Sequence, residues 1–197
     1  IWDLLTGKLL NSLEGHNAPV HAISINNNNI FSASADRTIK IWDLVTGKLK
    51  CTLLGHNNHV YSVLALKDKF ISTALDKTIK IWDTETKKLL KVITTGDNSA
   101  WALALKDNFL VAGLSDGTLR IYDFETGNLK FSTKEHEDSI TSVVIYDNRI
   151  ISASKDRSIK VWDLNNLDLI HTFKGHLSPI WHIYFDNYAK KVMSCSE

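Results

Sequence analysis

An internal repeat of 40 residues is the feature that most restricts what this 197-residue chain can fold into. Aromatic residues recur at this spacing, each followed by aspartate, at Trp2, Trp42, Trp82, Tyr122 and Trp162. Glycine–histidine pairs recur in the same register, at Gly15-His16, Gly55-His56 and Gly175-His176. A fixed period of this length indicates one small structural unit used repeatedly, rather than a fold with a single unique active site.

Each repeat is predicted to contain four short strands. In one copy, β-branched and apolar residues fill 60–66, 70–75, 78–83 and 89–94, with turn residues between these runs. Gly7, Gly47 and Gly127 mark the third turn, where glycine accepts a positive φ, and Asn166 is expected to do so in the last copy. Helical periodicity is absent. The sequence therefore predicts an all-β fold of four-stranded antiparallel units that bury their faces against one another.

Composition excludes several classes of protein. Lys and Arg number 23 against 22 Asp and Glu, and a net charge of +1 argues against nucleic-acid binding through a basic face. No apolar run approaches the roughly 18 residues of a membrane span, so no membrane partner is expected. Two cysteines, Cys51 and Cys195, are too few for a disulfide scaffold or a four-cysteine zinc site. We expect a cytoplasmic or nuclear protein.

The Gly-His to Trp-Asp spacing, with Ser-x-Ser-x-Asp between the two pairs, resembles the WD40 repeat family of β-propellers over the whole chain. The resemblance implies one propeller domain over residues 1–197, in which each repeat supplies strands a, b and c of one blade after strand d of the previous one. Residues 1–18 would end one blade, about 19–58, 59–98, 99–138 and 139–178 would form full blades, and 179–197 would start another. These five blade-equivalents could close as a five-bladed ring, but we favour an arc of a seven-bladed ring.

Serine, histidine and aspartate recur together, as in a nucleophilic triad. A hydrolase needs one nucleophile in one pocket, so three copies at a fixed period favour a structural role. The resemblance implies hydrogen-bonded Trp–Ser–His–Asp tetrads in three blades. Their members are His16, Ser32, Asp36 and Trp42; His56, Ser72, Asp76 and Trp82; and His136, Ser152, Asp156 and Trp162.

One repeat departs from this pattern. It has Gly96, Ala112, Asp116 and Tyr122 at the four positions, so only the aspartate remains. The blade is either a degenerate copy held by its neighbours or a blade relaxed for a ligand or for motion. The histidines occur once per repeat and would not converge on one ion, so no metal is expected. No Gly-rich phosphate-binding loop occurs, and no cofactor is expected.

A basic residue also recurs on each predicted strand c, at Lys40, Lys80, Arg120 and Lys160. We interpret this row as a solubilising rim that protects strand edges, with nucleic-acid contact as the alternative.

The resemblance places binding on the propeller face that carries the d–a and b–c loops. Two positions per blade point there, at the start of strand a and just before the turn aspartate. The first set is His21, Tyr61, Trp101, Thr141 and Trp181, and the second is Ala35, Leu75, Ser115, Lys155 and Glu197. From these we predict partner binding by Trp101, Tyr61, Trp181, His21 and Lys155, because aromatic residues commonly anchor interfaces. The alternative is that the rings only plug the channel mouth.

The sequence bears on three candidate functions. We expect a non-catalytic scaffold that binds peptides or proteins on this face. The short loops between strands a and b, such as Lys67-Asp68-Lys69, are similar to those of F-box/WD40 receptors, so the alternative is a substrate-recognition subunit of an F-box-type ubiquitin ligase. An enzyme is disfavoured because no unrepeated catalytic set is present.

Overall fold

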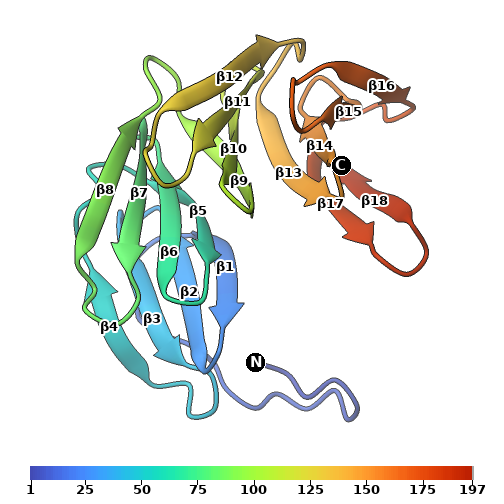
Figure 1. Cartoon of the computed structure of the whole chain (residues 1–197). Helices are drawn as coiled ribbons and strands as arrows, with labels where there is room; N and C mark the ends of the chain where they lie inside the picture. The colour runs from blue at the N-terminus through green and yellow to red at the C-terminus, as the bar shows by residue number, and fades with distance from the viewer. Residues whose placement is uncertain (197) are drawn as a thin grey trace. The chain divides into compact units, whose positions relative to one another are not determined.

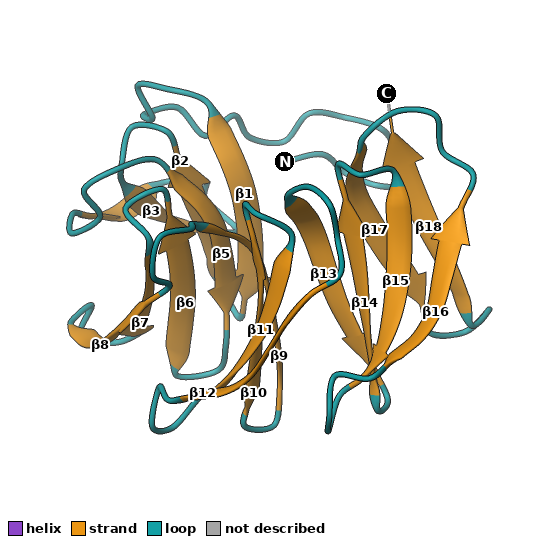
Figure 2. Ribbon diagram, turned by 90° about the horizontal axis from the view of Figure 1, so that it is seen from above, coloured by secondary structure: helices purple, strands orange, loops and turns teal. Residues whose placement is uncertain are grey.

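The computed structural model describes residues 1–196, which form strands, turns and loops without a helix (Figures 1 and 2). The chain divides into two compact units, Ile1–Val92 and Ile93–Glu197. The described residues contain four antiparallel sheets of four strands and one sheet of two strands, each built from consecutive strands. The all-β prediction is therefore confirmed.

The strands follow one another at the predicted period. The first sheet contains β1 (Val20–Asn26), β2 (Asn29–Ser34), β3 (Ile39–Asp43) and β4 (Leu49–Leu53). The second contains β5 (Val60–Ala65), β6 (Lys69–Ala74), β7 (Thr78–Asp83) and β8 (Leu89–Thr94). The third contains β9 (Ala100–Lys106), β10 (Phe109–Leu114), β11 (Thr118–Asp123) and β12 (Leu129–Lys134). The fourth contains β13 (Ile140–Tyr146), β14 (Arg149–Ser154), β15 (Ser158–Asp163) and β16 (Leu169–Lys174). The last contains β17 (Ile180–Asp186) and β18 (Lys191–Ser196).

Burial follows the position of each strand in its sheet. The second strands β2, β6, β10 and β14 are buried on both faces over nearly their whole length, which explains their continuous apolar or small-residue sequences. The fourth strands β4, β12 and β16 are mostly exposed and alternate less regularly. The sequence of each repeat thus runs from a half-buried strand through two buried strands to an outer one.

The hydrophobic core of the first unit lies between its two sheets. Phe31 and Ile41 of the first sheet are fully buried against a surface that includes Val60 and Phe70 of the second. The Phe31 and Phe70 rings are 4.9 Å apart between centroids, and Phe70 stacks on the Trp82 indole at 5.9 Å. One sheet therefore supplies its second and third strands to the core, and the next supplies its first two.

The second unit repeats this packing twice. Val111 and Ile121 of the third sheet pack with Ile140 of the fourth. Ile151 and Val161 of the fourth sheet then pack with Ile180 and Ile183 of the last. No sheet buries its apolar surface alone, so each depends on a sequence neighbour for stability.

The turn between the third and fourth strands differs from the prediction in the last copy. The residue with positive φ is Leu167 (φ 60), in the position that Gly47 and Gly127 occupy, so the assignment of this role to Asn166 was wrong. Leu167 is only 7% exposed and joins Leu164 in the core. Burial of its side chain offsets the strain that a left-handed conformation imposes on a non-glycine residue.

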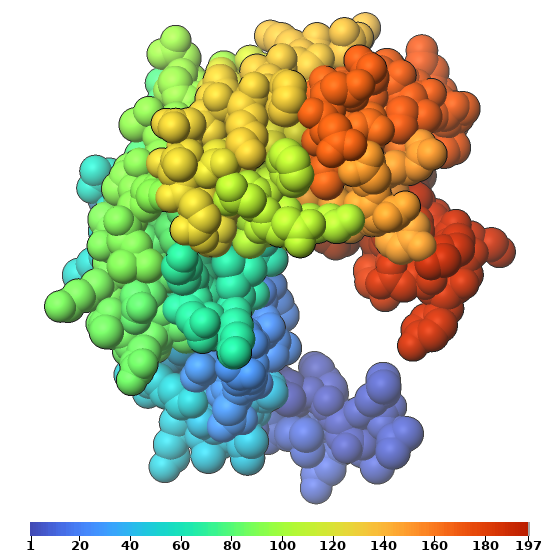
Figure 3. Space-filling view, in the orientation of Figure 1, coloured from blue at the N-terminus to red at the C-terminus, as the bar shows by residue number. Residues whose placement is uncertain are grey.

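The N-terminal segment is extended away from the first sheet (dark blue in Figure 3). Residues 1–18 were expected to end one blade, and within them the structure has a single antiparallel bridge, between Trp2 and Leu9. Trp2 is 68% exposed, whereas Trp42 and Trp82 at equivalent repeat positions are nearly completely buried. In residues 1–196 there is no helix long and apolar enough to cross a membrane.

Candidate functional site

Three copies of a four-residue hydrogen-bonded chain lie inside the sheets. In the second sheet, the Trp82 indole N–H donates to Ser72 Oγ at 2.9 Å, and Ser72 Oγ lies 2.8 Å from His56 Nε2. His56 Nδ1 lies 2.8 Å from an Asp76 carboxylate oxygen. The chains from Trp42 to Asp36 and from Trp162 to Asp156 have the same order, with all distances between 2.7 and 2.8 Å. Each connects strands two and three of a sheet to the loop that precedes strand one.

The aspartate at the end of each chain is held ionised. Burial alone would raise the pKa of Asp36, but hydrogen bonds from Thr38, His16 and backbone amides outweigh it and lower the pKa. The same balance lowers the pKa of Asp76 and Asp156. Burial also lowers the pKa of His56, against the opposing effect of Asp76. A neutral His56 can therefore donate from Nδ1 to Asp76 and accept from Ser72.

This geometry leaves no accessible nucleophile in the three chains. Ser72 and Ser152 are fully buried, Ser32 is 4% exposed, and the Oγ atom of each already accepts an indole N–H. A substrate carbonyl could not approach these atoms without opening the sheet. Within the described residues, no group of three or more His, Cys, Asp or Glu is placed to hold a metal ion.

The third sheet replaces the chain with a different set of contacts. Arg120 Nη1 donates to the Thr95 carbonyl at 3.0 Å and lies 3.5 Å from the hydroxyl of the buried Tyr122. Asp116 accepts hydrogen bonds from Thr118 and lies 3.6 Å from Lys134 Nζ. Arg120 thus links strand three to the loop before strand one. In the three complete chains, histidine and serine together make this link.

The prediction that the basic residues of the third strands form a solubilising rim was wrong. Lys40 and Lys80 are 8% and 7% exposed. Lys40 Nζ donates to Thr52 Oγ1 at 2.8 Å, Lys160 donates to Thr172 Oγ1 at 3.3 Å, and Lys80 donates to the Gly55 carbonyl. These side chains tie strand three to strand four or to the loop before strand one, because they share a sheet face with the buried aromatic residue two positions later.

The predicted binding residues occupy one end of their sheets because of a repeated backbone hydrogen bond. The residue before each turn aspartate donates its N–H to the carbonyl of the residue immediately before strand one. These pairs are Ala35 to Pro19, Leu75 to His59, Ser115 to Ser99 and Lys155 to Ser139, at 2.9 to 3.0 Å. Glu197, the last residue of the predicted set, lies outside the described residues.

Two predicted binding residues meet in the first unit. The His21 and Tyr61 rings stack with centroids 4.5 Å apart and an interplanar angle of 2°. His21 is exposed, and the centroid of the His59 ring lies 6.5 Å from that of His21. Partial burial and the nearby His59 lower the pKa of His21.

The other three predicted binding residues meet in the second unit. Lys155 Nζ lies 4.6 Å from the centroid of the Trp101 ring and 4.8 Å from that of Trp181. Trp101 and Lys155 are half-buried, and Trp181 is 44% exposed. We call these three residues the Lys155 clamp. Thr141, at the equivalent position between the two tryptophans, instead donates to the Ile180 carbonyl at 2.6 Å and so fixes the start of β17.

Known families and structures match this chain over most of its length. The family described as "WD domain, G-beta repeat" matches residues 7–43 and 47–83, and the TEP-1 C-terminal beta-propeller family matches residues 136–197. The computationally designed Ika4 protein shares 34% identity, with a TM-score of 0.73, over 81% of this chain and 100% of that chain. The chain belongs to the WD40 repeat family of β-propellers. Proteins of this family are generally non-catalytic scaffolds that bind other proteins.

A natural WD40 protein gives a longer match. The WD40 beta propeller domain of Doa1 shares 26% identity with a TM-score of 0.85 over 93% of this chain. The chain spans 62% of the length of that solved domain. A search of curated proteins gave no match.

The tetrads of this WD40 protein should make its stability depend on pH. The folded-state pKa values of Asp36, Asp76 and Asp156 lie below the ordinary 3.8, and that of His56 lies below 6.5. Each group therefore binds protons more readily in the unfolded chain, and stability falls as pH drops. We expect the urea midpoint to decrease below pH 6.5 and further below pH 3.8. Asp76→Asn should flatten the lower part of the profile. A midpoint that is constant from pH 7 to pH 3 would contradict this.

The third sheet should open more readily than its neighbour in the second unit. It lacks the tetrad, and its fourth strand β12 is almost entirely exposed. Amides in the least-supported unit exchange first through local opening. Hydrogen-exchange mass spectrometry should show faster exchange in β10 and β11 than in β14 and β15. Equal protection would mean that Arg120 and Tyr122 support the sheet as well as a tetrad does.

Proposed function

We propose that this WD40 protein is a non-catalytic scaffold that binds a peptide or protein partner at the sheet ends that carry the Lys155 clamp. The clamp is the observation that carries the proposal. Three residues from the starts of β9 and β17 and the loop after β14 converge at one end of the second unit. Tryptophan supplies a large contact area with little loss of rotamer entropy, which favours it as an interface anchor.

The charge of the clamp indicates what kind of partner group would bind. Among residues 1–196, no carboxylate pairs with the Lys155 ammonium, which instead faces two indole rings. Cation–π contacts stabilise the ammonium by about 0.5–2 kcal/mol but leave its hydrogen-bond donors available. A partner carboxylate would therefore suit this position. Phosphopeptide recognition is not supported, because arginine is absent from the predicted binding positions.

The stacked His21–Tyr61 pair supports a second contact area in the first unit. Like the tryptophans of the Lys155 clamp, these two rings are rigid and amphipathic, and His21 is exposed.

We place the scaffold in the cytoplasm or nucleus, since the described structure leaves both cysteines, Cys51 and Cys195, unpaired.

The proposal is tested by affinity capture followed by mass spectrometry with three forms of the chain. The wild-type chain should retain a defined set of proteins that is lost with the Trp101→Ala, Trp181→Ala double variant. Phe131→Ala is the matched control, because it removes an exposed aromatic ring from β12, the outer strand of the Trp101 sheet. Capture that survives the double variant but not Phe131→Ala would place the site on the outer strands.

A further inference from the structure

The charged residues of the chain are unevenly divided between its two units. Residues 1–92 carry 12 Lys and Arg against 8 Asp and Glu, whereas residues 93–197 carry 11 against 14. An overall charge of +1 is therefore compatible with a basic first unit. In physiological salt, exposed charges are screened beyond about 8 Å, so a partner senses the local charge rather than the overall one.

One end of the first unit is formed by turns from both of its sheets. In the first sheet, the Leu44 N–H donates to the Asn28 carbonyl at 3.0 Å, which holds the turn after β3 beside the turn after β1. The second sheet has the same bond at 2.9 Å. The Asn26 side chain then donates to the Lys67 carbonyl at 3.3 Å and so connects the two sheets at this end.

Three lysines at this end carry charges that the fold does not neutralise. Lys48 and Lys88 lie on the turns before β4 and β8, Lys67 lies on the turn after β5, and all three are exposed. Within residues 1–196 no carboxylate forms an ion pair with them, whereas the nearby Lys50 pairs with Asp43 at 2.8 Å. We call Lys48, Lys67 and Lys88 the basic end. Their ammonium groups are available to a partner.

The geometry of the turns does not require these lysines. The carbonyl at the repeat position of Lys48 accepts a backbone hydrogen bond at 2.8–2.9 Å in all four four-stranded sheets, at Lys48, Lys88, Asn128 and Asp168. The same turn thus forms with lysine, asparagine or aspartate. The position of Lys67 is likewise aspartate in the next two repeats, at Asp107 and Asp147. Because the lysines are confined to the first unit and are not needed for folding, they indicate a contact outside the chain.

Other exposed side chains at this end restrict the kind of anion that fits. Asp68 and Glu85 are exposed on the same turns, so a nucleic-acid backbone, with its dense phosphates, would place negative charges against them. Val45 is 72% exposed on one of the turns, and Leu90 is 51% exposed at the start of β8. A polypeptide can combine spaced carboxylates with apolar side chains, so its chemistry matches this surface best.

We propose that the basic end of the first unit binds an acidic polypeptide segment of a partner protein, in which apolar residues separate the carboxylates. The carboxylates pair with the three lysines, and the apolar side chains contact Val45 and Leu90. Single exposed ion pairs contribute little, so the segment gains affinity by engaging several lysines together and gains association rate through its charge. This surface does not include the Lys155 clamp, and the proposal does not depend on the function proposed for the clamp.

The test uses the full chain and three synthetic peptides of equal length. The first repeats Glu-Leu-Glu between Gly-Ser spacers, the second has glutamine in place of glutamate, and the third has serine in place of leucine. Fluorescence anisotropy should show saturable binding of the first peptide, with an affinity that falls as the NaCl concentration is raised. The second peptide should bind about tenfold more weakly or worse, since it cannot form ion pairs. The third should also bind more weakly than the first, because it lacks the apolar contacts.

A triple variant of the chain then locates the site. Lys48→Asp, Lys67→Asp and Lys88→Asp together should weaken binding of the first peptide about tenfold or more, because each change replaces an attraction by a repulsion. Later repeats carry aspartate or asparagine at these positions, so the variant is expected to fold. Circular dichroism checks this expectation.

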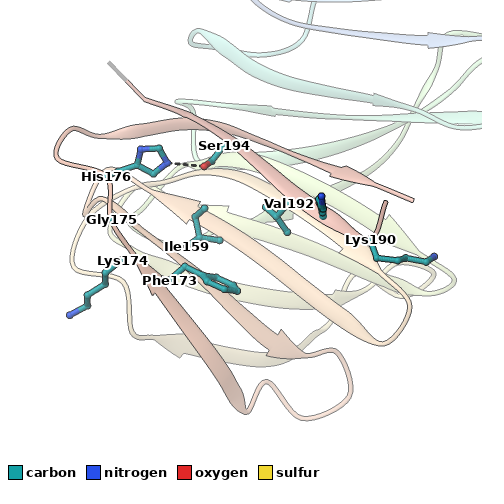
Figure 4. A pocket seen from close by; sticks show the side chains of 9 residues that line it. Ile159, Phe173, Lys174, Gly175, His176, Lys190, Val192 and Ser194 are labelled. Carbon is teal, nitrogen blue, oxygen red and sulfur yellow. Dashed lines mark hydrogen bonds between the residues drawn. The ribbon is translucent and has the colours of Figure 1, made fainter. Parts of the chain in front are cut away.

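The matched control changes the net charge by the same amount in the second unit. Arg149→Asp, Lys174→Asp and Lys191→Asp replace three exposed basic residues. Lys174 and Lys191 also line an apolar cavity of about 530 Å³, with Phe173 and Val192, which is another place where the leucine side chains of the peptide could bind (Figure 4). This variant should bind the first peptide as tightly as the wild-type chain does.

Four results would overturn the proposal. The first is equal binding of the glutamate and glutamine peptides, and the second is an equal loss of affinity in the control variant. The third is binding of the wild-type chain to vesicles of phosphatidylcholine and phosphatidylserine but not to the first peptide, because the lysines would then face a lipid surface. The fourth is a salt-sensitive dimer that the variant of the basic end abolishes, because the partner would then be a second copy of this chain.

Discussion

Replacing Ser72 with alanine is expected to destabilise the protein by about 1–3 kcal/mol. The Ser72 hydroxyl is fully buried and connects the Trp82 indole, at 2.9 Å, to His56, at 2.8 Å. Without it, both groups stay in the sheet interior and each loses a hydrogen-bond partner. Urea unfolding followed by circular dichroism should show the lower midpoint.

The neighbouring Thr73 provides a matched control for Ser72→Ala. Thr73 is also fully buried, but its hydroxyl has no hydrogen-bond partner among the described residues. Thr73→Val should therefore leave stability unchanged or raise it, since it removes a polar group that the fold does not use. Equal losses for the two variants would show that Ser72→Ala acts through packing rather than through the hydrogen-bonded chain.

A double-mutant cycle separates the hydrogen bond from the remaining effects of Ser72→Ala. Trp82→Phe removes the indole donor and should cost less in the Ser72→Ala background than in the wild-type chain, because the bond is already absent. Additive losses would contradict cooperation between the two residues. The same cycle is not possible in the third sheet, where Ala112 and Tyr122 already occupy these positions.

The sequence was sufficient to predict the strands and their grouping into sheets. Period-two patterns, turn residues and a fixed repeat are local signals, and they survive in the fold because, within each unit, sheets that are neighbours in sequence form the core together. Leu167 shows the limit of local reasoning. Its positive φ is stabilised by core burial, which depends on the tertiary structure rather than on the turn itself.

The burial of the basic residues in the third strands follows from a spacing that is present in the sequence. Lys40 lies two positions before Trp42, so the two side chains must share one face of β3. A lysine two residues before a buried tryptophan is therefore predicted to place its amine next to the core. Arg120 has the same relation to Tyr122, and its contact with the Thr95 carbonyl follows from it. The Lys155 clamp could not be predicted as a contact, because its three residues come from separate repeats and only folding brings them together.

Replacing Trp101 with alanine is expected to weaken partner binding by about 2 kcal/mol or more, a loss of roughly thirtyfold in affinity. The indole lies against the Lys155 ammonium at 4.6 Å and is only half-buried, so much of its surface remains available to a partner. Its own sheet has no tetrad, and Trp101 has no place in the hydrogen-bonded chains of the others. The melting temperature should therefore change little. Affinity is measured by calorimetry with the partner obtained by capture.

Lys155→Met separates the charge of the clamp from its shape. Methionine keeps most of the lysine stem between the Trp101 and Trp181 rings but removes the ammonium. If a partner carboxylate binds there, this variant should lose affinity and the remaining binding should depend less on salt concentration. Phe131→Ala, on the outer strand of the Trp101 sheet, should leave both affinity and salt dependence unchanged. A partner that covers the Lys155 clamp must lose contacts when the two tryptophan side chains of the clamp are removed. Full affinity in folded Trp101→Ala and Trp181→Ala chains would therefore show that the partner binds on another surface.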